Sequence, residues 1–156
     1  MWNKEEKTNA YELLLAQQKA LIEGETDLIS ILANSSALLN ETLPNTVFAG
    51  YYLYKNDELI LGPFQGRVSC VHIALGKGVC GEAAEKRQTL IVENVKEHKN
   101  YIACDSAALS EIVVPMEKSG QLIGVLDLDS NQIGLYDEID QKYLEQYVRI
   151  ILENVA

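Results

Sequence analysis

Residues 111–128, EIVVPMEKSGQLIGVLDL, contain the pattern that decides the fold. Two apolar runs, residues 111–116 and 122–128, flank the polar stretch 117–121, which contains Gly120. Apolar runs of this length on either side of a short glycine-containing turn are typical of two antiparallel strands joined as a hairpin. We therefore predict that an antiparallel sheet forms the centre of this protein.

Four further strands are predicted upstream of this hairpin. Residues 47–54 are rich in aromatic and β-branched side chains, and the turn Asn56-Asp57 leads into a hairpin partner. A short helix is predicted over residues 81–87. The additional strands are residues 47–54, 58–61, 69–73 and 89–92. Together the six strands predict a meander with one long crossover loop.

Apolar residues at helical spacing predict two helices before the sheet and one after it. The first stripe runs from Tyr11 to Leu21 and the second from Leu28 to Leu39, with Gly24 between them. Asp137 is a candidate N-cap of the last helix, because a second acid, Asp140, follows three residues later. Helices at both ends of an antiparallel sheet predict an α+β sandwich.

Composition favours a single globular domain in the cytoplasm. With 156 residues and 47% hydrophobic content, the chain is expected to form one domain, residues 1–156. Its net charge of -10 argues against nucleic acid and anionic membranes as partners. The N-terminus has no apolar signal segment, and no apolar run approaches the roughly 20 residues that span a bilayer. In a reducing compartment cysteines are more often free or catalytic than structural.

The sequence does not support a dinucleotide-binding site, a histidine-based active site or a metal site with known ligand spacing. Residues 76–81, GKGVCG, match the dinucleotide pattern G-x-G-x-x-G, but the neighbouring strands are predicted to be antiparallel. A tight turn leading into a short helix is the preferred interpretation. His72 and His98 are the only histidines; His72 lies in an apolar strand, and His98 has the surroundings of a solvated loop residue. No C-x-x-C or H-x₃-H spacing predicts a metal site.

Thiols and acids are the strongest chemical signal in the chain. Cys104 lies in a long irregular stretch, residues 93–110, and such long loops are often lids or active-site loops. Asp127 and Asp129 alternate along a strand and share one face, and Glu111 lies at a comparable level on the hairpin neighbour. Clustered carboxyls in an enclosed pocket raise one another's pKa, so that one stays protonated near neutral pH. A solvated acidic edge is the alternative.

An aromatic pair provides a second signal. Phe48 and Tyr52 stand four residues apart on a predicted strand, so they share one face. Such a wall suits a small ligand with an apolar or sulfur-bearing end. Ordinary core packing is the alternative for this pair.

Five runs, taken in order, resemble those of the free methionine-R-sulfoxide reductases, which are single GAF-domain enzymes. The resemblance covers essentially the whole chain, which makes it far more specific than any one motif. It implies a six-stranded antiparallel sheet with the N-terminal and C-terminal helices on one face and an active-site loop on the other. The runs are residues 61–66, 78–81, 102–106, 110–115 and 124–130.

The resemblance implies that the three cysteines have different roles. Cys104 matches the thiol that attacks the sulfur of free L-methionine (R)-S-oxide and becomes a sulfenic acid. Cys70 matches the thiol that condenses with it, and Cys80 matches a third cysteine that assists resolution. Thioredoxin would reduce the resulting disulfide with electrons from NADPH, without a bound cofactor. A second thiol is chemically required because it converts a sulfenic acid into a reducible disulfide.

The same resemblance assigns the substrate-binding residues. Glu111, Asp127 and Asp129 match carboxyls that bind the ammonium group and protonate the sulfoxide oxygen. Phe48 and Tyr52 match the aromatic wall around the methyl-sulfur end. This chain departs from the family at position 48, where tryptophan is usual, and at Tyr101, where histidine is usual; Ala108 and Leu109 also replace more polar residues.

Two other functions remain open from the sequence. A ligand-sensing GAF module would bind a small molecule without chemistry, and a thiol redox switch would form a disulfide without reducing sulfoxide. A homodimer is also left open, since the sequence does not fix the oligomeric state.

Overall fold

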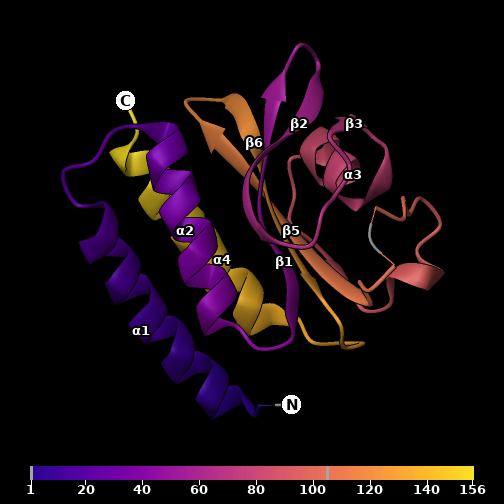
Figure 1. Cartoon of the computed structure of the whole chain (residues 1–156), viewed down its shortest axis with the longest axis horizontal. Helices are drawn as coiled ribbons and strands as arrows, with labels where there is room; N and C mark the ends of the chain where they lie inside the picture. Colours follow the sequence, from indigo (N-terminus) through magenta and orange to yellow (C-terminus); the bar gives the residue numbers. More distant parts are fainter. Residues whose placement is uncertain (1, 105) are drawn as a thin grey trace.

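The computed structural model describes residues 2–104 and 106–156. It consists of helices packed on both faces of an antiparallel sheet (Figure 1). In chain order the elements are α1 (Lys4–Ile22), α2 (Leu28–Thr42), β1 (Thr46–Lys55), β2 (Glu58–Gly66), β3 (His72–Ala74), α3 (Gly78–Lys86), β4 (Leu90–Val92), the 3₁₀ turn η1 (Val95–Glu97), β5 (Ser110–Lys118), β6 (Gln121–Ser130) and α4 (Glu138–Asn154).

The six strands form one antiparallel sheet in the order β3-β2-β1-β6-β5-β4. The predicted hairpin is present as β5 and β6, and it pairs through β6 with β1 at the centre of the sheet. The six strands were predicted to form a meander with one long crossover, and the structure has its crossover between β3 and β4. β3 and β4 lie at opposite edges of the sheet, and α3 lies between them in the chain. The sheet is therefore two three-stranded meanders joined side by side.

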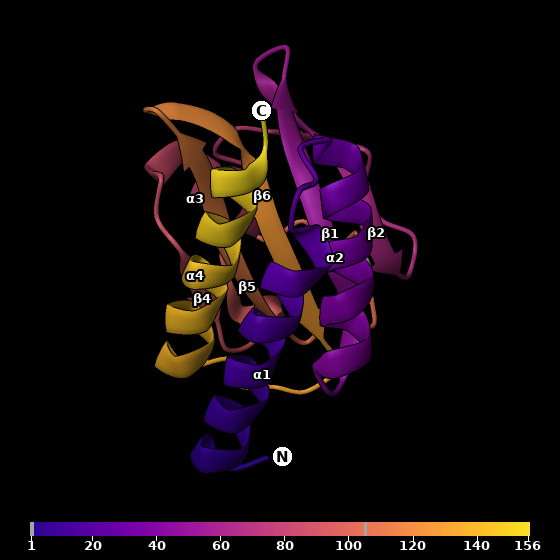
Figure 2. The same cartoon turned by 90° about the vertical axis from the view of Figure 1, so that its left-hand side faces the viewer.

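Two helices, α2 and α4, pack on one face of the sheet, and α1 packs against both of them on the outside (Figure 2). α4 begins at the predicted cap: the Asp137 side chain accepts a hydrogen bond from the N–H of Ile139, and Asp140 completes a capping box. No helix among residues 2–104 and 106–156 is long and apolar enough to cross a membrane.

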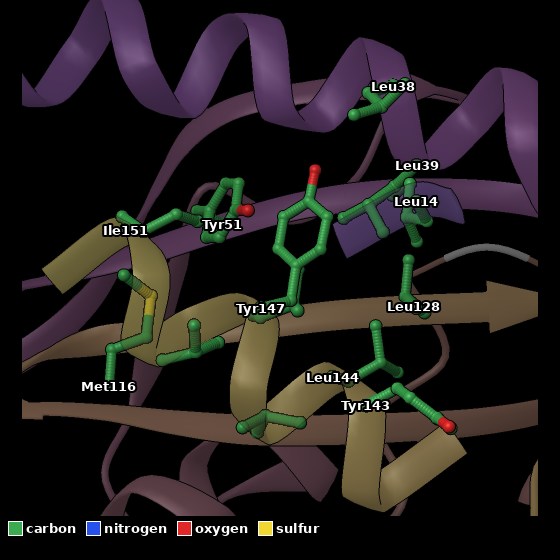
Figure 3. Close-up of a cluster of buried hydrophobic side chains, with 14 of the residues drawn as sticks. Leu14, Leu38, Leu39, Tyr51, Met116, Leu128, Tyr143, Leu144, Tyr147 and Ile151 are labelled. Carbon is green, nitrogen blue, oxygen red and sulfur yellow. The ribbon is translucent and has the colours of Figure 1, made fainter. Parts of the chain in front are cut away.

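The larger hydrophobic core lies between these helices and the sheet (Figure 3). Tyr51, Met116 and Leu128 project from the strands toward Leu39 of α2 and Tyr147 of α4. Two buried hydroxyls within this core are hydrogen-bonded to Ser35: Tyr147 donates to its carbonyl at 2.8 Å, and the Tyr51 hydroxyl lies 2.8 Å from its Oγ. Side chains of this face thus serve packing alone, and the polar residues of β6 must face the other way.

The opposite face of the sheet carries α3 and residues 93–104 and 106–109, as Figure 1 shows. A second, smaller hydrophobic cluster lies there and includes Phe48, Tyr52, Cys80 and Val125. Alternation along β6 explains the division, because Leu126 and Leu128 face the helices while Val125 belongs to the second cluster. The predicted α+β fold, with helices on one face and an active-site loop on the other, is confirmed.

The glycine-rich residues 76–81 form a tight turn into α3, as predicted. Gly76 and Gly78 have φ values of 81° and 63°, a region that suits glycine best. α3 begins at Gly78, three residues earlier than predicted. The strands beside this turn are antiparallel, so the parallel βαβ context of a dinucleotide site is missing from the described residues.

Two strand boundaries differ from prediction in ways that matter for the site. β3 starts at His72 instead of residue 69, so Ser69 and Cys70 lie in the loop between β2 and β3. β2 extends to Gly66 through Gly62 and Pro63, residues that weaken a strand signal in sequence. This extension is stabilised by pairing with β1, an effect that local sequence does not reveal.

Candidate active site

A pocket opens on the α3 face of the sheet, between the strands, the start of α3 and the loop that carries Cys104. It brings together all of the residues that the sequence singled out, apart from Cys70, whose neighbour Ser69 is in the lining. The lining consists of Phe48, Tyr52, Ser69, Ile73, Gly78, Val79, Cys80, Tyr101, Ile102, Cys104, Ala108, Glu111, Asp127 and Asp129.

Three carboxyl groups form the floor of the pocket. Glu111 on β5 and Asp129 on β6 are directly paired across the two strands, and Asp127 lies on the same face of β6. Glu111, Asp127 and Asp129 are 6%, 3% and 9% exposed, so the alternative of a solvated acidic edge is wrong. The antiparallel register thus makes neighbours of Glu111 and Asp129, which are 18 residues apart in the chain.

Burial controls the protonation of these acids. It is the main cause that raises the pKa of Glu111 well above its usual range, followed by the charge of Asp127. Burial also raises the pKa of Asp127 well above its usual range, followed by the charge of Asp129. Two carboxylates this close resist ionising together. The floor can therefore retain at least one proton near neutral pH and act as an acid.

Cys80 lies over the same acids. It is buried in the first turn of α3, and its Sγ lies 3.8 Å from Oε2 of Glu111, within reach of a weak S–H hydrogen bond. Burial, reinforced by Asp127 and Glu111, raises the pKa of this thiol well above its usual range. Cys80 is therefore a protonated, unreactive thiol in this state. Ligand atoms of Cys80, Glu111 and Asp127 lie within 4.8 Å of one another, a spacing that could hold a metal ion.

Cys70 and Cys104 form a disulfide at the edge of the pocket, with their Cα atoms 5.3 Å apart. Cys70 comes from the loop before β3 and Cys104 from the loop between η1 and β5, and both are half-buried. Cys80 is free. The structure thus separates the cysteines into a half-buried disulfide pair and a buried free thiol.

Aromatic side chains form one wall. Phe48 stacks on Tyr52 with ring centroids 6.2 Å apart and on Phe64 at 5.1 Å. Tyr52 donates its hydroxyl hydrogen to the carbonyl of Cys70 at 3.0 Å, so the 2.8 Å contact with Ser69 has the serine as donor. Neither Phe64 nor Ser69 was predicted as a site residue, although Phe64 lies within the run 61–66 and Ser69 directly precedes Cys70.

Two polar contacts anchor the Cys104 loop to α3. His98 Nε2 lies 2.9 Å from Oε2 of Glu82, and Asn100 donates to the carbonyl of Gly76 at 2.7 Å. Lys86 and then His98 lower the pKa of Glu82 to about 2, so this carboxylate stays ionised. The prediction that His98 is a solvated loop residue is wrong, because the fold brings the loop onto a helix that is distant in sequence.

The space left in the pocket is about 30 Å³. A cavity that binds benzene measures about 150 Å³, whereas a cavity of about 10–15 Å³ is enough for one water molecule. The disulfide state therefore has room for a water molecule or a single ion, and none for an amino acid.

Comparison with known proteins identifies the family to which this chain belongs. The family model described as "GAF domain" matches residues 25–152. The free methionine-R-sulfoxide reductase of Escherichia coli is 46% identical over 142 residues, which are 91% of this chain and 86% of that protein.

Solved structures of the same group superpose closely on this chain. The fRMsr of Staphylococcus aureus in complex with substrate is 48% identical with a TM-score of 0.90, and the match covers 94% of this chain and 95% of that one. The free methionine-R-sulfoxide reductase of Neisseria meningitidis, also in complex with its substrate, is 39% identical with a TM-score of 0.93, over 99% of this chain and 93% of that one.

Proposed function

This chain belongs to the family of free methionine-R-sulfoxide reductases, built on a GAF domain, and we propose that it reduces free L-methionine (R)-S-oxide to L-methionine. The observation that carries the proposal is a reducible disulfide, Cys70–Cys104, beside a floor of buried acids. Reduction of a sulfoxide needs a thiol at the sulfur and a proton donor at the oxygen, and this pocket offers both.

The substrate binds with its two ends in different parts of the pocket. Its ammonium group pairs with carboxylate oxygens of the floor, because a buried negative group gains most from a cation. Its methyl-sulfur end lies against Phe48 and Tyr52, since aromatic rings make favourable contacts with sulfur. Recognition of both the ammonium group and the methyl group favours the free amino acid over a residue within a protein.

The reaction begins with Cys104. Its thiol attacks the sulfoxide sulfur, and a protonated floor carboxyl, Glu111 or Asp127, protonates the departing oxygen. The oxygen leaves the substrate and ends on Cys104 as a sulfenic acid, while the substrate sulfur gains two electrons and becomes the sulfide of methionine. The raised pKa values of both carboxyls support this role, because an acid that is ionised at neutral pH could not donate.

Recycling uses Cys70 first. Its thiol attacks the sulfenic acid of Cys104, so that an S–S bond forms, the S–O bond breaks and water leaves. A dithiol protein of the thioredoxin class, itself reduced from NADPH, then supplies two electrons and two protons to restore both thiols. The 5.3 Å separation of the two Cα atoms supports direct condensation of Cys70 with Cys104. Cys80, which is free and buried, has at most an assisting role in this step.

The size of the pocket adds a conformational step. Because only about 30 Å³ is free in the disulfide form, the substrate enters after reduction, when the Cys104 loop is no longer tied to Cys70. Disulfide formation then also expels the product.

The deciding experiment couples the protein to thioredoxin, thioredoxin reductase and NADPH and adds each free sulfoxide epimer in turn. We expect NADPH oxidation with the R epimer and none with the S epimer. Cys104→Ser should abolish turnover, Cys70→Ser should release one methionine per chain and then stall, and Cys80→Ser should retain most activity.

Three results would contradict the proposal. Turnover undiminished in Cys104→Ser would remove the assigned nucleophile. Saturable binding of the R epimer without turnover would indicate a sensing module. Disulfide closure by hydrogen peroxide, with neither epimer reduced, would indicate a thiol redox switch.

A further inference from the structure

Three potential metal ligands converge in the pocket from three separate elements. Cys80 comes from α3, Glu111 from β5 and Asp127 from β6, and one ligand atom of each lies within 4.8 Å of the others. All three side chains are buried. A sulfur and two carboxylate oxygens at this spacing can share a single cation at ordinary bond lengths of about 2.0–2.3 Å.

One of these groups has an unused coordination position. Oδ1 of Asp127 accepts no hydrogen bond from the described residues, although the side chain is buried. A buried oxygen without a partner is costly, and such a group calls for a water or an ion. This atom belongs to a side chain that lines the pocket, so the unsatisfied oxygen lies beside the other two potential ligands.

Charge and volume both favour a small cation. The described lining contains three carboxyl groups and a thiol, but no lysine, arginine or histidine. In the disulfide form the free space of about 30 Å³ accommodates an ion and excludes an amino acid. The pocket is thus a cavity large enough for one ion and lined by groups that become anionic when they lose their protons.

From this geometry we propose that the pocket binds one divalent cation of the zinc class through Sγ of Cys80 and the carboxylates of Glu111 and Asp127. A mixed sulfur and oxygen donor set suits Zn²⁺ or Cd²⁺, whereas Mg²⁺ and Ca²⁺ prefer oxygen alone. Binding forms a metal–thiolate bond and releases the Cys80 proton to solvent, together with any proton held by the two carboxyls.

The consequence for activity rests on the proposed function. In the reduced protein the cation occupies the carboxylates that receive the substrate's ammonium group, so it competes with the sulfoxide. Zinc then raises the KM for the sulfoxide without lowering kcat, and a chelator restores the original KM.

The test uses the oxidised protein and Cd²⁺ alone. Cys80 is the free cysteine when Cys70 and Cys104 are paired, so any cadmium–thiolate charge-transfer absorption reports on Cys80. We expect the band to saturate at one equivalent of Cd²⁺, to strengthen as the pH rises, and to be displaced by Zn²⁺. Cys80→Ser should abolish the band, and Asp127→Asn should weaken Cd²⁺ binding at least tenfold.

A matched control separates this site from general attraction to an acidic surface. Glu153→Gln removes an exposed carboxylate on α4 and should leave the titration unchanged. The proposal is overturned if no band appears at millimolar Cd²⁺, or if calorimetric Cd²⁺ binding is the same in Cys80→Ser and Asp127→Asn as in the parent. Because this titration needs no sulfoxide, its failure leaves the reductase proposal intact, and failure of the reductase assay leaves the titration valid.

Discussion

The buried carboxyl of Asp127 is expected to lower the stability of the fold at neutral and higher pH, although the proposed reaction uses it. Its carboxyl is buried, its pKa is raised, and its Oδ1 has no hydrogen-bond partner among the described residues. A buried carboxyl binds its proton more tightly in the folded protein than in the unfolded chain. As the pH rises from the usual carboxyl range through the raised pKa, the unfolded chain loses this proton first, so the free energy of unfolding falls.

Asp127→Asn removes that loss, because an amide of the same shape has no proton to release. We expect the variant to melt higher than the parent at pH 8, with a difference that shrinks toward pH 4, while sulfoxide turnover falls. Each unit by which the pKa is raised is worth about 1.4 kcal/mol above that pKa. Thermal unfolding at several pH values measures the effect, with Glu153→Gln as the exposed control. A variant less stable than the parent at pH 8 would show that the carboxylate is compensated by interactions beyond those described.

Tyr52 connects the aromatic wall of the pocket to Cys70, the proposed resolving cysteine. Its ring lines the pocket, and its hydroxyl donates to the carbonyl of Cys70 and accepts from Ser69. Tyr52→Phe keeps the ring and removes both hydrogen bonds, each worth about 1 kcal/mol. We expect disulfide formation to slow by roughly 5- to 30-fold while release of the first methionine is little changed.

Rapid-quench measurements separate the two steps, because the sulfenic acid that accumulates can be trapped with a carbon nucleophile. Tyr54→Phe is the matched control, since its hydroxyl contacts Asp57 at an exposed turn. Equal slowing of both steps in Tyr52→Phe would mean that the hydroxyl acts on substrate binding instead of on Cys70.

At the scale of elements, α3 ends in a strained residue. Arg87 has a left-handed backbone, with φ 55° and ψ 41°, a conformation that glycine adopts without steric cost. Its contact with Glu117 at 3.5 Å is largely exposed and contributes little. The helix end is therefore held by its surroundings and not by the preference of its own residue.

Arg87→Gly and Arg87→Ala both remove this ion pair, so the difference between them isolates the backbone strain. We expect the glycine variant to be more stable than the alanine variant by about 1 kcal/mol in equilibrium denaturation. Equal stabilities would indicate that the end of α3 relaxes out of the left-handed conformation.

At the scale of the whole molecule, a buried ion pair fastens α1 to α4. Lys7 Nζ lies 2.6 Å from Oδ2 of Asp140, and their side chains are 4% and 2% exposed. Tyr11 also donates to Oδ1 of Asp140 at 2.6 Å. These contacts lie on the helix face of the sheet, whereas the pocket lies on the other face.

Lys7→Ala should destabilise the fold by about 3–5 kcal/mol, because it leaves a buried carboxylate without its cation. The double variant Lys7→Met with Asp140→Asn should recover most of this loss. We expect turnover per folded molecule to remain at the parental level in the double variant, since the sheet separates the two layers. Denaturation curves and specific activity test both statements, and a loss of activity in the folded double variant would show that the layers are coupled.

Sequence alone determined most of the architecture and the chemical class of the site. The hairpin of β5 and β6, the cap at Asp137 and the turn at residues 76–81 were predicted because each depends on local backbone chemistry. Alternation along β6 also predicted that Asp127 and Asp129 share a face. The order of the strands was not predictable, because pairing between β1 and β6 joins segments about 75 residues apart without a local signal.

Only the tertiary structure decided which of these groups meet and how they are protonated. It brought Cys70 to Cys104, placed Cys80 over Glu111 and Asp127, and connected His98 to Glu82. Burial depends on how the whole molecule packs, and it is the main cause that raises the pKa values of Glu111 and Asp127. These protonation states therefore could not be predicted from the sequence. A sequence specifies the periodicity of its side chains, whereas desolvation depends on what the rest of the chain places over them.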